Sequence, residues 1–502
     1  MKQQVIIIGG GLGGLFAGAI LSKEGFRVTI LEKNAMIGGG LQTFQRFGEH
    51  FDTGMHVIGG MQPGGNIRKL CRYLGILDDV KIRNVDDECT DRLYFAEDKT
   101  YYTIAKGRDG FVSSLAQSFP DERDNLERYV DAVLDIADKV DLFNLRPSTG
   151  QMSFFAESND FLMAADAFIA KYITDERLRS VLAYMNPLYG GRSHETPAYV
   201  HAIISTLYIR GASRFVDGSY HFAQLLSDVI TSNGGQVIPG DAVERIYVVD
   251  RRVEYVRTKS GKQYTADYYI SDIHPCMLMK LMDEKAFPKS YRERLETIPN
   301  THSAFAIYIK FKPETFLYIN HSEYYLTRYN DVWDFGRADK PWPLGFLMMT
   351  PPNSHQGHYA TKALITAPMP FNMVKQWENT TVGHRGAEYE AWKKKCTEQL
   401  LKQIEEIHPG FRECIEAVNT SSPLTIRDFY GVKDGSICGF AKNCQNIVLS
   451  QVPVVTKVRN LLLTGQNINL HGFCGVPLTA ITTCEAILGV NYIINKVNLC
   501  AD

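Results

Sequence analysis

The sequence has no excess of charge of either sign: 54 Lys and Arg residues stand against 56 Asp and Glu residues, a formal net charge of −2. Chains that bind nucleic acid carry basic patches, so nucleic acid is not expected as a partner. No apolar run is long enough to span a bilayer. Only four residues precede the first apolar stretch, which leaves no room for a signal peptide, so we expect a cytoplasmic protein.

The ten cysteines are scattered and form no C-x-x-C pair. That spacing argues against a metal centre and a disulfide framework, and it fits a reducing compartment. We expect the cysteines to serve as small buried apolar residues. At 502 residues the chain is too long for one core, so two or more domains are predicted.

A glycine motif stands near the start of the chain. Val5–Ile8 is an unbroken apolar run, typical of a strand buried on both faces of a parallel sheet. Gly9, Gly11 and Gly14 follow in G-x-G-x-x-G spacing. The first glycine permits a tight turn, the second lets backbone approach a pyrophosphate, and the third lets a helix pack close to the strand. That helix is predicted over Leu12–Ser22, with its N-terminal amides facing the phosphates.

A second predicted strand, Arg27–Leu31, ends at Glu32, which lies 18 residues after Gly14. A carboxylate at this point accepts hydrogen bonds from ribose hydroxyls. Strand, glycines, helix, second strand and acid together predict a Rossmann-like α/β unit that binds a dinucleotide. The alternative is a glycine-rich turn in an α/β protein without a ligand.

The residues after Glu32 indicate which dinucleotide to expect. Gly38–Gly40 form a second glycine cluster, and Phe51–Gly60 reads FDTGMHVIGG. These segments resemble the FAD-dependent amine-oxidase and phytoene-desaturase superfamily, in which Glu-x(5)-Gly-Gly followed by F-D-x-G marks FAD. Within it, FDTGMHVIG is most similar to the retinol saturase and carotenoid isomerase branch. The family often has Arg soon after the paired glycines, where this chain has Gly40 and Leu41.

The last segment resembles the C-terminal FAD segment of the same superfamily. A predicted strand over Asn460–Leu463 is followed by Gly465 and Gln466. A glycine-bearing loop then runs to Pro477, and a helix is predicted over Leu478–Leu488. Residues 422–425 and 434–439 resemble a segment of the isomerase and saturase branch.

The resemblance implies FAD as the cofactor and permits NAD(P)H as an external electron donor. We expect FAD to be held without a covalent link, because the flavin-facing loops offer no evident attachment context beyond His56, His471 and Cys474. The FAD-binding residues that it implies are Gly9, Gly11, Leu12, Gly13, Gly14, Glu32, Lys33, Gly39, Gly40, Leu41, Met55, His56, Val243, Gly465, Gln466, Gly475 and Val476.

Candidate catalytic residues follow from the same resemblance. His56 lies in the loop that the family places near the isoalloxazine ring, and His471 lies in the C-terminal flavin loop. Each histidine either donates a proton to a reduced alkene or holds flavin charge, or it only hydrogen-bonds backbone. Asp52 is expected to order its loop. Arg214 is expected, by family position, to approach the flavin or the pyrophosphate.

The expected fold is α/β. It combines a discontinuous Rossmann-like FAD-binding domain, of the GR2 type with a β-meander, and a mixed α+β substrate domain. The FAD-binding domain comprises residues 1–105, 211–275 and 421–502, and the substrate domain comprises residues 106–210 and 276–420. The meander is predicted over Ala242–Val249, Arg252–Arg257 and Tyr264–Ile270.

The reaction implied by the resemblance is hydride transfer at carbon–carbon bonds of a lipophilic polyene or isoprenoid. It is saturation, desaturation or reduced-flavin isomerisation, with saturation favoured. One alternative is a flavin amine oxidase, whose site is commonly framed by aromatic residues in the C-terminal half, where this chain offers only Phe473. The other is a prenyl-binding protein like the Rab GDP-dissociation inhibitors, whose glycine signals are degenerate whereas those here are intact.

Aromatic and apolar residues gather at Phe154, Phe155, Phe161, Leu162 and Met163. They form either the core of a helical domain or the wall of a substrate tunnel. We expect the substrate to enter between residues 151–210 and the sheet at 303–367. Because a polyene partitions into lipid, loading from a membrane surface by transient peripheral contact is also expected. Lys393–Lys395, on a predicted helix over Glu388–Ile407, either contact anionic lipid or form a solvated helix face.

Overall fold

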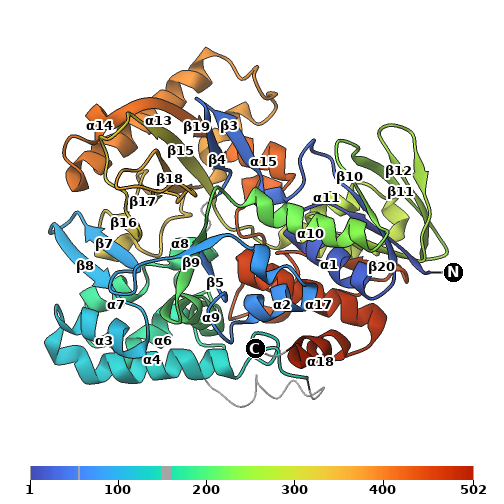
Figure 1. Ribbon diagram of the computed structural model, residues 1–502, viewed down its shortest axis with the longest axis horizontal. Coiled ribbons are helices and arrows are strands. Elements are labelled where there is room, and N and C mark those ends of the chain that lie inside the picture. Colours follow the sequence, from blue (N-terminus) through green and yellow to red (C-terminus); the bar gives the residue numbers. More distant parts are fainter. Residues whose placement is uncertain (1, 55–56, 149–159, 501–502) are drawn as a thin grey trace.

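The computed structural model describes residues 2–54, 57–148 and 160–500 and is built around two large sheets (Figure 1). The first sheet has five strands in the order β10–β2–β1–β14–β20, and every neighbouring pair is parallel. Its central strand is apolar and buried from Val5 to Ile8, as predicted. The strands are Gln4–Ile8 (β1), Arg27–Leu31 (β2), Gln236–Ile238 (β10), Tyr268–Ser271 (β14) and Leu461–Leu463 (β20).

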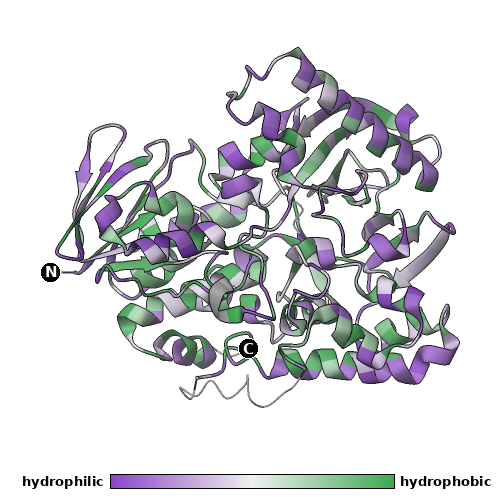
Figure 2. Ribbon diagram, turned by 180° about the vertical axis from the view of Figure 1, so that it is seen from behind, coloured by the Kyte–Doolittle hydropathy of each residue, from purple (hydrophilic) through white to green (hydrophobic). Residues whose placement is uncertain are grey.

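Helix α1 (Leu12–Lys23) follows β1 and packs against both α10 (Tyr220–Ser232) and α17 (Gly472–Leu488). Close packing depends on small residues: a Cβ on Gly18 would lie 3.0 Å from side-chain atoms of Ile230 and Ile30. In Figure 2 the strands and helices near the centre of the molecule are largely hydrophobic, whereas outer helices and turns carry the hydrophilic residues. The hydrophobic interior therefore fixes how this helix, which begins at the glycine motif, sits on the sheet.

The β-meander differs from the expectation in one strand. Strands β11 (Val243–Val249), β12 (Arg252–Thr258) and β13 (Gln263–Tyr264) form a small antiparallel sheet. The predicted strand Tyr264–Ile270 was wrong as a single element: the meander ends at Tyr264, and β14 runs beside β1 in the five-stranded sheet. The reason is burial, because Tyr269 and Ile270 are fully buried between β1 and β20.

The second large sheet has seven strands in the order β19–β15–β18–β17–β16–β7–β8. It corrects the expected boundary at residue 105, because β7 pairs in parallel with β16, from Asp91 with Ser322 to Phe95 with Leu326. Residues 91–104 thus belong to the sheet assigned to the substrate domain, and the rest of the division stays a prediction. The strands are Asp91–Phe95 (β7), Thr100–Ile104 (β8), Ser303–Phe311 (β15), Ser322–Leu326 (β16), Gly345–Met349 (β17), Lys362–Met369 (β18) and Ile415–Ser421 (β19).

Helices flank the seven-stranded sheet. One hydrophobic cluster joins Phe305 and Ile307 of β15 to Leu400 and Ile404 of α13 (Ala387–Ile407). In the lower left of Figure 1 lies a group of helices that pack against one another and reach from the edge of the molecule toward its centre. They are α3 (Arg108–Ala116), α4 (Arg123–Asp138), α6 (Ala165–Tyr172), α7 (Glu176–Leu182), α8 (Asn186–Tyr189) and α9 (Ala198–Ile209).

Part of the aromatic cluster predicted near residue 160 falls within the described residues. Phe161 is fully buried and stacks on Tyr199 of α9, with the ring centroids 4.8 Å apart, so it belongs to the core. Leu162 and Met163 are half-buried. Phe154 and Phe155 lie outside the described residues.

Smaller elements connect these layers. Strands β5 (Val57–Gly59), β9 (Ala212–Phe215) and β6 (Ile82–Asn84) form a three-stranded sheet, and β3 (Thr43–Arg46) pairs with β4 (Glu49–Asp52). The remaining helices are α2 (Asn66–Leu74), α11 (Pro275–Met279), α12 (Lys289–Thr297), α14 (Phe411–Cys414), α15 (Pro423–Tyr430), α16 (Ile447–Ser450) and α18 (Tyr492–Leu499).

Helix α17 begins at Gly472, six residues before its predicted start, and contains Pro477. The expected loop therefore ends earlier, and Pro477, which has no backbone N–H to donate, lies inside the helix. Within the described ranges no single helix is long and apolar enough to cross a membrane. The pair Gly472–Leu488 and Tyr492–Leu499 passes that test together by length and composition, with a bend of 118°.

Candidate functional site

The loops at the carboxyl ends of β1, β2 and β14 border a cavity of about 610 Å³. Gly9, directly after β1, has φ +104°, a left-handed conformation that favours glycine. A Cβ on Gly14 would lie 2.1 Å from the Gly9 carbonyl oxygen, so only glycine allows α1 to start this close to the strand. The amino end of α1 thereby faces the cavity, which is the arrangement that binds phosphate groups.

Glu32 ends β2 as predicted and is buried. Its Oε2 accepts a hydrogen bond of 2.8 Å from the Gly10 N–H, and its Oε1 accepts one of 2.7 Å from the Asn34 N–H. The carboxylate therefore fixes the backbone on both sides of the dinucleotide cradle and also lines the cavity. A carboxylate oxygen has lone pairs left for a ribose hydroxyl.

A second glycine loop lies against the first. The Gly38 N–H donates to the Gly10 carbonyl oxygen at 2.7 Å, and a Cβ on Gly39 would lie 3.0 Å from the Cα of Gly11. A third loop, after β20, approaches from the other side: a Cβ on Gly13 would lie 3.0 Å from the Cα of Gly465. The glycines thus allow three loops to meet where a larger side chain would fill the space.

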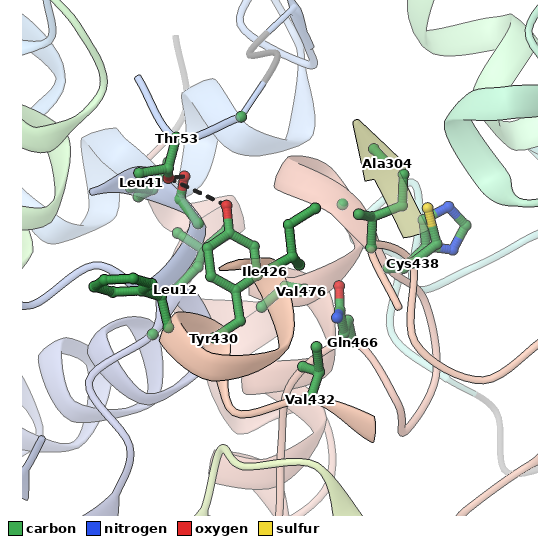
Figure 3. A pocket seen from close by; sticks show the side chains of 18 of the residues that line it. Leu12, Leu41, Thr53, Ala304, Ile426, Tyr430, Val432, Cys438, Gln466 and Val476 are labelled. Atoms are coloured by element: carbon green, nitrogen blue, oxygen red, sulfur yellow. Dashed lines mark hydrogen bonds between the residues drawn. The ribbon is translucent and has the colours of Figure 1, made fainter. Parts of the chain in front are cut away.

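Helix α15 lies over the cavity, which sequence reasoning did not anticipate. Tyr430 points from α15 toward Thr53, and their hydroxyl oxygens are 3.1 Å apart (Figure 3). Lys33 Nζ donates to the Asp428 carbonyl oxygen at 2.7 Å, and Asn34 Nδ2 donates to the Phe429 carbonyl oxygen at 2.9 Å. Burial lowers the pKa of Lys33. The only available signal was the resemblance of residues 422–425, which carries no information about these contacts.

The structure brings most predicted cofactor residues to this cavity. Gly14 and Gly465 do not line it but support its loops, and Gly475 lines only a smaller adjoining cavity. Met55 and His56 lie outside the described residues. The predicted residues that line the cavity are Gly9, Gly11, Leu12, Gly13, Glu32, Lys33, Gly39, Gly40, Leu41, Val243, Gln466 and Val476.

Arg214 does not line the cavity, which corrects the expectation that it approaches the flavin or the pyrophosphate. It is buried, and its guanidinium donates to the Ile319 carbonyl oxygen at 3.2 Å and to Ser322 Oγ at 3.1 Å. Strand β9 carries it beside the seven-stranded sheet, where it stabilises backbone instead. Asp52 behaves as expected, since its Oδ1 accepts from the Ser219 N–H at 2.8 Å and orders the loop.

His471 lines the cavity at the start of α17, and its Nε2 has no hydrogen-bond partner among the described residues. Burial, assisted by the nearby Lys442 cation, lowers the pKa of His471 to about 4. His274 also lines the cavity and was missed, although it lies only three residues after β14. Its Nε2 lies 3.0 Å from Asn300 Oδ1, and burial lowers its pKa to about 4. Both rings are therefore neutral near pH 7.

The cavity continues from the glycine loops into an apolar chamber between the helical group and the seven-stranded sheet. Among the described lining residues, the charged ones are Glu32, Lys33, Asp272 and Lys280, which directly follow β2, β14 and α11. An adjoining cavity of about 80 Å³ shares Leu188, Tyr208 and His471 with it. The chamber is lined by Pro187, Leu188, Tyr208, Ala304, Ala306, Tyr324, Leu326, Phe335, Phe346, Leu347 and Pro368.

Comparison with known proteins matches residues 12–341 to the family described as flavin containing amine oxidoreductase. This chain belongs to the flavin-containing amine oxidoreductase family. It is an enzyme, an FAD-dependent oxidoreductase, and the predicted α/β FAD-binding fold is confirmed.

Two curated relatives of this flavoprotein span most of its length. The all-trans-retinol 13,14-reductase of Rattus norvegicus is 25% identical, over 98% of this chain and 86% of its own. Prolycopene isomerase 2, chloroplastic, of an Oncidium hybrid cultivar is 23% identical, over 93% of this chain and 80% of its own. These relatives place the flavoprotein in the group that its FDTGMHVIG segment indicated.

Solved structures share the fold of the flavoprotein. An oxidoreductase from Methanosarcina mazei superposes with a TM-score of 0.65 at 18% identity, covering 96% of this chain and all of its own, 100%. Wild-type putrescine oxidase bound to putrescine has a TM-score of 0.64 at 12% identity, covering 97% of this chain and 99% of its own. Identities this low show the fold alone.

The residues of the flavoprotein fit FAD. The glycine loops leave backbone N–H groups at the amino end of α1 for the pyrophosphate, and Glu32 stands at the ribose position. FAD, when bound, supplies hydride transfer to or from carbon. The chain itself contributes the glycine loops that hold the dinucleotide, helix α15, which covers the cavity, and an apolar chamber next to the glycine loops.

Proposed function

We propose that this flavoprotein transfers hydride at a carbon–carbon double bond of a lipophilic polyene or isoprenoid, with saturation as the favoured direction. The observation that supports it is the continuity of the cavity from the FAD cradle into an apolar chamber without charged lining residues in the described part of the chain. An apolar chain gains about 25 cal/mol for each Å² that it buries in such a chamber.

The names of the relatives support the same substrate class. One is called a retinol 13,14-reductase and another a prolycopene isomerase, both acting on polyenes by name. Saturation consumes electrons, so an external reductant such as NAD(P)H is part of the proposal. Saturation, desaturation and isomerisation share one site. Saturation oxidises the reduced flavin and needs that reductant, desaturation reduces the oxidised flavin and needs an acceptor, and isomerisation leaves the flavin reduced.

In this reaction, residues that line the cavity exclude water and handle a proton. Phe346, Leu347 and Phe335 exclude water from the substrate carbons. His471 lines the cavity, and its buried Nε2 has no other partner among the described residues, so this ring can hold or pass a proton once a substrate or a change of rotamer brings the two together. The predicted role of His56 stays a prediction.

The test is anaerobic incubation of the reduced holoenzyme with a panel of retinoids and carotenoids. Reoxidation of the flavin together with loss of the polyene absorption supports the proposal. Two variants with the same substitution make the test specific to the chamber. Leu347→Trp fills the chamber and should abolish the reaction while FAD is retained. Leu317→Trp, at a residue that is 53% exposed and does not line the cavity, should leave the reaction rate unchanged. Reduction of the oxidised flavin by amines, with no polyene reacting, would instead establish the amine oxidase alternative.

We also propose transient contact with a membrane surface on the cytoplasmic side, since a polyene substrate resides in lipid. The contact of Lys393–Lys395 with anionic lipid stays a prediction. Lys393 is half-buried beside Tyr389 and Glu390, whereas Lys394 and Lys395 are exposed, and α13 lies far from the helical group (Figure 1). Val490 and Leu499 support the proposal better, because they are 74% and 84% exposed at α18.

Helix α18 packs against α17 and α2, and Asn498 Nδ2 donates at 2.8 Å to the carbonyl oxygen of Leu145, which lies seven residues after the end of α4. The holoenzyme should sediment with lipid vesicles. The double variant Val490→Ser and Leu499→Ser should sediment less, and Leu317→Ser should behave as the native protein. Absence of the native protein from the vesicle pellet at every salt concentration would contradict the membrane contact.

A further inference from the structure

Asp272 occupies the centre of the FAD cradle. It follows β14 directly, and its Oδ2 lies 2.7 Å from where a Cβ on Gly11 would be. Its Oδ1 lies 2.3 Å from the same position on Gly13 and 2.5 Å from that on Gly465. The carboxyl group therefore fills the space that these glycines leave between two loops. It also lines the cavity, so a ligand in the cradle contacts it.

The surroundings of Asp272 disfavour a negative charge. Burial, with the Glu32 carboxylate adding to it, raises the pKa of Asp272 to about 7, although the N–H groups of Gly14 and Gly11 act in the opposite direction. The same N–H groups lie at the amino end of α1, where the pyrophosphate of a bound dinucleotide is held. An ionised Asp272 would compete with the pyrophosphate for these donors and repel it.

Other titratable groups around the cradle do not offset the repulsion between an ionised Asp272 and the pyrophosphate. Glu32 lies at the end of β2 and is itself acidic. Lys33 directs its Nζ to the Asp428 carbonyl oxygen. His274 and His471 carry no charge near pH 7, because burial lowers the pKa of each to about 4. Protonation of Asp272 resolves the conflict, since a neutral carboxylic acid offers an O–H donor to a phosphate oxygen.

We propose that Asp272 is an FAD-binding residue that acts as the neutral carboxylic acid, so that FAD binding takes up as much as one proton when the free site is ionised. This inference depends on FAD being the cofactor and not on the proposed substrate. The affinity for FAD therefore depends on pH. The protonated protein binds FAD more tightly, so the dissociation constant is lowest in acid and rises with pH above the pKa of the free site, by up to tenfold per pH unit.

The experiment follows release of FAD from the diluted holoenzyme by flavin fluorescence, from about pH 6 to about pH 9. The native protein should release more FAD as pH rises through about 7. Asp272→Asn, which keeps the shape and an N–H donor but cannot ionise, should give a dissociation constant independent of pH and lower than the native value at about pH 9. Asp267→Asn is the matched control, because this exposed carboxylate lies at the other end of β14, and it should keep the native profile.

Two results would overturn the inference. A native dissociation constant that does not change with pH would exclude the bound proton, whether or not Asp272→Asn folds. An Asp272→Asn protein that keeps the native slope would assign the titration to another group, such as Lys33. Neither result bears on the substrate, so failure here is distinguishable from failure of the proposed reaction.

Discussion

Thr53 and Tyr430 are 377 positions apart in the chain, and their hydroxyl oxygens lie 3.1 Å apart above the cofactor cavity (Figure 3). Thr53 Oγ1 also donates to the Gly40 carbonyl oxygen at 3.1 Å. This pair connects the loop that carries the second glycine cluster to helix α15. The contact therefore closes the cavity between an N-terminal and a C-terminal segment.

Removing the hydroxyl of Tyr430 should loosen this closure. One hydrogen bond contributes about 0.5–1.5 kcal/mol, so Tyr430→Phe should release FAD about two- to tenfold more readily on dilution. Flavin fluorescence after gel filtration measures how much FAD each variant retains. Tyr359→Phe, at an exposed position, is the control. Equal FAD retention in both variants would show that the contact does not help to hold the cofactor.

Replacing Glu32 should weaken FAD binding more strongly. Hydrogen bonds to a charged group contribute about 1.5–3 kcal/mol, and the upper value corresponds to roughly a hundredfold. Glu32→Ala also leaves the Gly10 and Asn34 amides without their acceptor, so a lower melting temperature of the apoprotein is expected. Titration of apoprotein with FAD checks the first effect. Native affinity in Glu32→Ala would contradict the ribose assignment.

Gly14 should tolerate no side chain. A Cβ there would lie 2.1 Å from the Gly9 carbonyl oxygen, so Gly14→Ala must displace α1 or the first loop, at a cost of about 1–3 kcal/mol. Lower thermal stability and lower flavin content are expected together. Gly357→Ala, where nothing lies within 4 Å, should match the native protein. A fully flavinated, native-like Gly14→Ala protein is incompatible with this packing.

His471 should act without a charge. Its pKa of about 4 means that activity should show no titration of this ring between about pH 5 and about pH 8. His471→Gln, which can still hydrogen-bond, should retain more activity than His471→Phe.

The His471 ring also makes the free energy of unfolding depend on pH. Its contribution is full above about pH 6.5 and is lost as pH falls toward 4, because the unfolded chain binds the proton more readily. Chemical unfolding at several pH values checks this sign.

FAD should be held without a covalent bond. Cys474 is buried, its pKa is raised to about 12 by burial, and its Sγ lies 3.4 Å from Asn66 Oδ1, so it does not offer a thiolate for attachment. Precipitation with acid should leave all yellow colour in the supernatant. Colour in the pellet would show a covalent link.

Much of the FAD cradle could be predicted from residues close together in the sequence. Val5–Ile8, the glycines that follow it and Glu32 determine a strand, a turn, a helix start and an acid within one βαβ unit. Their geometry depends on local backbone conformation and on hydrophobic burial, both of which are encoded in neighbouring residues. The same local pattern carried the resemblance that led to FAD and to the family.

The positions of Arg214, Asp272 and the Thr53–Tyr430 contact were decided only by the tertiary structure. Arg214 lies outside the cofactor cavity, because β9 pairs with β5 and β6 and the guanidinium donates to the Ile319 carbonyl oxygen. Asp272 joins the cradle because β14 leaves the meander and lies parallel to β1. Such placements depend on pairing between segments hundreds of residues apart, whose register is set by burial in the whole fold and not by any local pattern.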